Sequence, residues 1–143
     1  MEENTKKLLG ECNSGCKMAV DSMNQVSHYV TDEKLAGVIA KYSSKHKEIE
    51  VETFKLLAQE GQGEKEPGAF VSAFSWLTTE MKMMAKDDNQ QAAKIMMNGC
   101  NMGIQSITET MHECAGASEE SMSLAKKLVR TEEDLMNEMK NFL

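Results

Sequence analysis

The stretch "GQGEKEPG", residues 61–68, divides the chain into two halves of similar pattern. It holds three glycines and the only proline of the 143 residues, and such clusters end helices and begin loops. On both sides, apolar residues recur every three to four positions over about 25 residues, which is typical of a helix buried along one face. The sequence therefore predicts two long helices before this break and two after it.

The predicted long helices cover residues 5–29, 33–60, 90–115 and 118–143, and a shorter helix covers residues 69–86. "TDE" at 31–33 and "GAS" at 116–118 supply the two short turns, and "KDDN" at 86–89 can cap the third long helix. Gly116 suits the position that follows a helix end, and Ser118 suits a helix N-cap. Four inward stripes are expected: Leu9, Cys12, Cys16, Ala19, Met23, Val26 and Val30; Leu35, Ile39, Tyr42, His46, Ile49, Thr53 and Leu56; Ala93, Met96, Cys100, Gly103, Ile107, Thr110 and Cys114; Ser121, Ala125, Leu128, Glu132, Leu135, Met139 and Phe142.

Loop lengths then decide the topology. The short turns make each pair of long helices an antiparallel hairpin. The segment 61–88 contains an 18-residue helix that would span about 27 Å, most of the length of a 25-residue helix. It can therefore return the chain to the far end of the bundle. We expect an all-α protein with one domain, residues 1–143: a ferritin-like antiparallel four-helix bundle with a short crossover helix between the second and third long helices.

The composition and charge of the chain limit the classes of partner that it is expected to bind. Hydrophobic residues make up 41%, aromatic residues 5% and charged residues 27%, and the net charge is −7. An acidic chain without a basic stripe disfavours nucleic acid and anionic membranes as partners. With no signal peptide or membrane span in the pattern, the expected location is cytoplasmic, where four cysteines would remain thiols. Self-association into a homo-oligomer stays open.

Several segments resemble a bacterial ferritin-like four-helix-bundle family of unknown function. They are "CNSGCKMAVDSM" (12–23), "SKHKEIEVETFKLLAQEG" (44–61), "GAFVSAFSWLTTEMK" (68–82) and "DDNQQAAKIMMNGCNMG" (87–103). The wider superfamily often holds two metal ions with one Glu from each of two helices and Glu-x-x-His from each of the other two.

The resemblance can be carried to individual positions of this chain. His46 is retained, but Ser43 stands in its Glu slot, and Val129 precedes Glu132 by the same three residues. Cys16 (or Cys12) and Cys100 occupy the remaining Glu slots. The loss of carboxylates argues against a di-iron oxidase or an iron-storage protein. The one literal Glu-x-x-His, Glu109 to His112, should face outward from the helix.

Five potential ligands lie on the inward stripes near the middle of the predicted bundle. They are Cys12, Cys16, His46, Cys100 and Glu132. Thiolate, imidazole and carboxylate together suit zinc, thiolates also suit copper(I), and iron is less favoured. This is a candidate metal site without a catalytic residue.

A simpler interpretation competes with the metal site. Buried free cysteines often act as small apolar residues, and methionines fill gaps in a core. His46 and Glu132 could also pair with each other and need no metal. The sequence therefore predicts an uncharacterised, non-catalytic bundle protein with a candidate core metal site. The alternatives are a structural or interaction protein, such as a stress or spore component, and, less favoured, a di-iron oxidase or iron-storage protein.

Overall fold

The computed structural model describes residues 2–61 and 88–143 of the chain. They form four α-helices, α1 (Glu2–Ser27), α2 (Glu33–Gln59), α4 (Asn89–Glu113) and α5 (Glu119–Met139), followed by a short 3-10 helix, η1 (Lys140–Phe142). This part of the chain contains no β-strand. The predicted helix at 69–86 lies outside the described residues.

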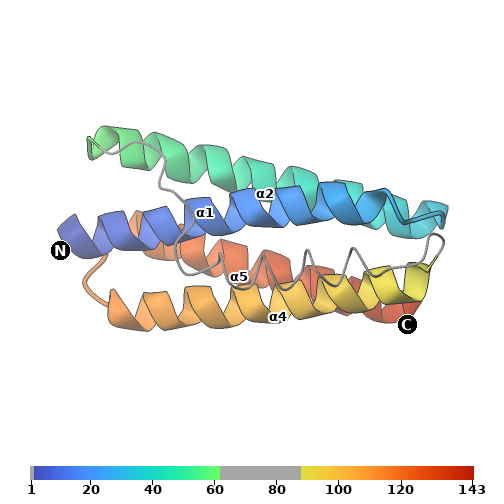
Figure 1. Cartoon of the computed structure of the whole chain (residues 1–143). Helices are drawn as coiled ribbons and strands as arrows, with labels where there is room; N and C mark the ends of the chain where they lie inside the picture. Colours follow the sequence, from blue (N-terminus) through green and yellow to red (C-terminus); the bar gives the residue numbers. More distant parts are fainter. Residues whose placement is uncertain (1, 62–87) are drawn as a thin grey trace.

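The helices form two antiparallel hairpins packed along their lengths (Figure 1). α1 and α2 make one hairpin, α4 and α5 the other, and α1 also contacts α4 and α5. α2 ends beside the N-terminus, whereas α4 begins at the opposite end of the bundle. The fold class is therefore confirmed: an all-α bundle in which residue 61 and residue 88 lie at opposite ends. None of the helices in these two ranges is long and apolar enough to cross a membrane.

Local side chains start and stop the helices where the sequence predicted, to within a few residues. Asp32 caps α2 by accepting from the Leu35 amide at 2.9 Å, and Asp88 caps α4 by accepting from the Gln91 amide at 3.0 Å. Ser118 caps α5 in the same way. Gly61 follows the end of α2 with φ of 76°, a left-handed conformation that glycine adopts without steric cost.

Gly116 has a different role from the one predicted. Among the described residues Gly61 is the glycine with a positive φ, so the backbone of Gly116 is not left-handed. A Cβ atom at Gly116 would instead lie 3.2 Å from Nδ2 of Asn4. The small residue therefore lets the α4–α5 turn approach the start of α1.

The predicted stripes form the core, with a few exceptions at helix ends and inside α1 and α4. Leu57, and not Leu56, is the buried leucine at the end of α2, while Ala19, Val30, Gly103 and Phe142 are only partly buried. The shift at Leu57 is expected because an α-helix drifts relative to a strict 3-4 spacing over seven turns.

Each turn is also hydrogen-bonded to the other hairpin. Oδ1 of Asn89 in α4 accepts from the amides of Thr31 and Asp32 at 2.9 and 3.1 Å, and Nδ2 of Asn89 donates to Oγ1 of Thr31 at 3.0 Å. At the other end, Oγ1 of Thr5 in α1 accepts from the Ser118 amide at 2.9 Å. These contacts hold the hairpins in one longitudinal register.

Candidate functional site

His46 and Glu132 form a buried pair at the centre of the bundle. Nε2 of His46 makes a hydrogen bond with Oε1 of Glu132, and the imidazole has no exposed surface. Nδ1 of His46 lies 2.7 Å from the carbonyl oxygen of Tyr42, one turn earlier in α2. Because a carbonyl only accepts, Nδ1 carries a hydrogen and Nε2 is the nitrogen that faces the carboxyl group.

The surroundings of His46 favour its charged form. Burial alone lowers the pKa of the imidazole, but the hydrogen bond and the charge of Glu132, together with the Tyr42 carbonyl, outweigh burial and raise the pKa above its usual 6.5. The hydrogen bond with Glu132 therefore favours the protonated form of the His46 ring over the neutral form.

Cys100 extends the pair into a third helix. The thiol hydrogen-bonds the Glu132 carboxylate, and burial, the charge of Glu132 and that bond raise the pKa of Cys100 well above its usual range. Imidazole from α2, carboxyl from α5 and thiol from α4 thus form one connected chain of polar groups. All three residues are at least nine-tenths buried.

Cys16 and Cys12 lie on the other side of this chain, in α1. Burial, together with the charges of Cys12 and Glu132, raises the pKa of the Cys16 thiol well above its usual range, whereas burial next to Glu11 raises that of Cys12 to about 12. Both pack in a cluster with Ile49 and Ile107. Cys16 is therefore within electrostatic range of Glu132, and no interaction in the structure joins Cys12 to Glu132.

All four cysteines are buried and in the thiol form. With pKa values raised by burial, the three thiols of Cys12, Cys16 and Cys100 are protonated near neutral pH. This is the opposite of the lowered pKa that marks a reactive cysteine. The site as it stands supplies no nucleophile.

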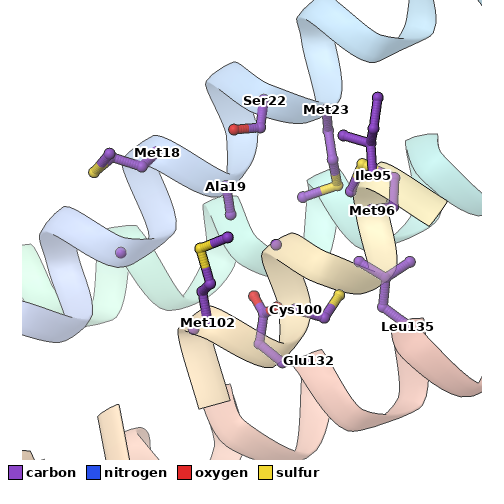
Figure 2. A pocket seen from close by; sticks show the side chains of 13 residues that line it. Met18, Ala19, Ser22, Met23, Ile95, Met96, Cys100, Met102, Glu132 and Leu135 are labelled. Carbon is purple, nitrogen blue, oxygen red and sulfur yellow. The ribbon is translucent and has the colours of Figure 1, made fainter. Parts of the chain in front are cut away.

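A pocket opens beside the polar chain, between α1 and α4 (Figure 2). Its volume is about 70 Å³, and Cys100 and Glu132 are among its lining residues. The carboxyl group lies against Gly103 of α4: a Cβ there would sit 3.5 Å from Cδ and Oε2 of Glu132, an ordinary van der Waals contact. Four methionines complete the sulfur lining: Met18, Met23, Met96 and Met102.

The di-iron arrangement of the ferritin-like superfamily does not fit this core. Among the described residues, Glu11 and Glu132 are the buried carboxylates, which is too few for a site built from four. Within residues 2–61 and 88–143, no three His, Cys, Asp or Glu side chains stand in an arrangement that could hold a metal ion. His46 and Cys100 instead both direct their hydrogen-bonding groups at Glu132.

The outward prediction for the literal Glu-x-x-His is confirmed. Glu109 and His112 are both exposed on α4. The prediction that Glu132 faces inward is confirmed too: its side chain is buried, whereas that of its neighbour Glu133 is exposed. Sequence reasoning missed the pocket. It placed Met23 and Met96 on apolar stripes, but Met18 and Met102 lie beside the stripes, and only the packing of α1 on α4 brings the four together.

Comparison with known proteins yields one structural neighbour and no family. No family model and no curated protein matches the sequence. The fold is similar to the crystal structure of a DUF305 fragment from Deinococcus radiodurans, with a TM-score of 0.74 and 14% identity over 96% of this chain and 93% of that chain. At this identity the likeness shows the fold alone: an all-α four-helix bundle.

Proposed function

We propose that this protein is a non-catalytic bundle protein that binds a metal ion in its core. The observation that carries the proposal is the chain formed by His46, Glu132 and Cys100, which brings imidazole, carboxyl and thiol from three helices together in the core of the bundle. Buried polar groups are costly unless they are satisfied. Three side chains of metal-ligating types at one height of the bundle are therefore more than a packed core requires.

The chemistry of the group suits zinc or copper(I) better than iron. Cys16, His46, Cys100 and Glu132 are the proposed ligands, and Cys12 is the weakest candidate because it has no link to Glu132. Binding requires the His46 ring and the Cys100 thiol to give up their hydrogen bonds with Glu132. Because thiols must lose their protons to coordinate, we expect proton release and an affinity that increases with pH.

Titration of the untagged protein with Zn²⁺ and Cu(I), alongside elemental analysis, tests the proposal. We expect Cys100→Ser and Cys16→Ser to weaken metal binding by about tenfold or more, as loss of a ligand or its support does. Cys114→Ser is the matched control, since Cys114 is an equally buried thiol near the α4–α5 turn. Wild-type protein that binds neither metal, or equal affinities in all three variants, would falsify the proposal.

A structural role is the second candidate, favoured by one observation: the His46–Glu132 hydrogen bond is complete without a metal. In that case the pair would only set the register of α2 on α5, and the melting temperature would be indifferent to chelators and to added metal. The ferritin-like assignment and a cytoplasmic location belong to the proposal as well. They are supported by the positions of residues 61 and 88 at opposite ends of the bundle and by the four buried thiols, which suit a reducing compartment.

A further inference from the structure

Sulfur is concentrated in the pocket between α1 and α4. Five of its lining side chains carry sulfur: Met18, Met23, Met96, Cys100 and Met102. Thioether and thiolate sulfurs are soft ligands that select soft ions such as copper(I). The carboxyl group of Glu132 and the thiol of Cys100 are the acidic side chains in the lining.

The sulfurs extend from the surface into the core. Met18 and Met102 are partly exposed, whereas Met23, Met96 and Cys100 are buried. Figure 2 shows these side chains coming from both walls of the pocket, α1 and α4, with Glu132 approaching from α5. The outer thioethers therefore mark a path by which an ion could reach Cys100.

The pocket has room for an ion. Its volume of about 70 Å³ exceeds the roughly 10–15 Å³ that a cavity needs to hold one water molecule. A single ion held by side-chain sulfurs therefore fits.

The lining decides which ion class suits the pocket. The carboxyl group of Glu132 is already engaged by its hydrogen bond with His46, and most of the remaining potential ligands are thioethers, together with the Cys100 thiol. Thioethers and thiolates bind soft ions of the copper(I) class in preference to hard divalent ions.

We propose that this pocket binds one monovalent thiophilic ion, of the copper(I) or silver(I) class, through the Cys100 sulfur and the thioethers of Met23 and Met96. On binding, the S–H bond of Cys100 breaks, its proton leaves to solvent and a sulfur–metal bond forms, with no change of oxidation state and no change of net charge. This rests on the proposed metal-binding function. It keeps Cys100 as a ligand and adds the ion class and the methionine ligands, in place of His46 and Glu132, which stay hydrogen-bonded to each other.

Silver(I) is the probe, because it stays monovalent without a reductant. Affinity is measured by competition titration on the full chain of wild type, Cys100→Ser, and the double variant Met23→Leu/Met96→Leu. Leucine keeps the apolar volume and removes the sulfur, so the core stays filled. Met136→Leu is the matched control, since Met136 is partly buried against the same cluster and does not line the pocket.

We expect Cys100→Ser and the double methionine variant each to weaken silver(I) binding by about tenfold or more, with Met136→Leu equal to wild type. Unchanged affinity in the double variant overturns the inference, while the proposed function stands if Cys100→Ser still loses metal. Tighter Zn²⁺ than silver(I) binding overturns the ion class and again leaves the function standing. Absence of any metal binding overturns both. Circular-dichroism melts confirm that each variant is folded.

Discussion

Glu132 and Glu133 are adjacent in α5 and have opposite surroundings. Glu133 is exposed, whereas Glu132 faces His46 in the core with 7% of its surface accessible. A buried carboxylate without a partner costs several kcal/mol, so Glu132 is tolerable only because His46 and Cys100 satisfy it. The same dependence holds for the imidazole of His46.

Removing both members of this pair should therefore cost less than the sum of the two single removals. We expect His46→Leu and Glu132→Leu each to lower the free energy of unfolding by about 3 kcal/mol, because each leaves a buried polar partner unpaired. The double variant should cost less than the sum of the two by about 1 kcal/mol or more. Urea unfolding of the four proteins measures the cycle.

Glu133→Leu controls for the helix position and should change stability by less than about 0.5 kcal/mol. Strictly additive losses in the cycle would show that the two side chains do not interact. If either leucine variant fails to fold, His46→Gln and Glu132→Gln give the same cycle with milder changes.

At the scale of the elements, the two hairpins are joined by polar contacts at both ends as well as by the core. Asn89, the first residue of α4, holds the α1–α2 turn through the amides of Thr31 and Asp32. Thr5 holds the α4–α5 turn through the Ser118 amide. Helices that slide along one another lose these contacts before they lose apolar burial, so the end contacts specify register.

Asn89→Ala should lower stability by about 1 kcal/mol, the usual net value of a partly exposed hydrogen-bonded group. Hydrogen exchange at the amides of Thr31 and Asp32 should also become faster, because both lose their acceptor. The exposed neighbour Gln90, changed to Ala, is the control. Equal exchange rates in the two variants would mean that the turn is held by packing alone.

At the scale of the whole molecule, the buried imidazole of His46 links unfolding to pH. The pKa of His46 is raised above 6.5 in the folded protein. The pair therefore stabilises the fold fully below the unfolded value, near 6.5, and this stabilisation is lost as the pH rises through the folded pKa. The groups that face the ring are Glu132 from α5 and the Tyr42 carbonyl of α2, and Cys100 of α4 lies behind Glu132.

The expected result is a free energy of unfolding that falls more steeply for wild type than for His46→Gln as the pH rises above about 6.5. The difference between the two proteins is the quantity to follow. Three buried thiols with raised pKa values also weaken the fold once the unfolded thiols ionise, and the subtraction removes their contribution. A difference that is constant or increases with pH would contradict an imidazolium in the core.

The periodic stripes made the bundle predictable, and they also placed Glu132 inward and Glu109 outward. Capping was predictable for Ser118, because a helix end depends on residues within one turn. The role of Gly116 was not predictable, because its neighbour Asn4 is more than a hundred residues away in the sequence. The methionine pocket was not predictable for the same reason: no local sequence pattern shows which residues of α1 meet which residues of α4.

The sequence alone determined the helices, their inward faces, the two hairpins and the single long connection between them. These follow from periodicity, turn residues and loop length, which are local properties of the chain. Only the tertiary structure decided that Glu132 pairs with His46 and Cys100, that Cys12 stays apart, and that four methionines share one pocket. Those facts depend on the rotation and axial shift of each helix against its neighbours, which the packing of side chains far apart in the sequence sets.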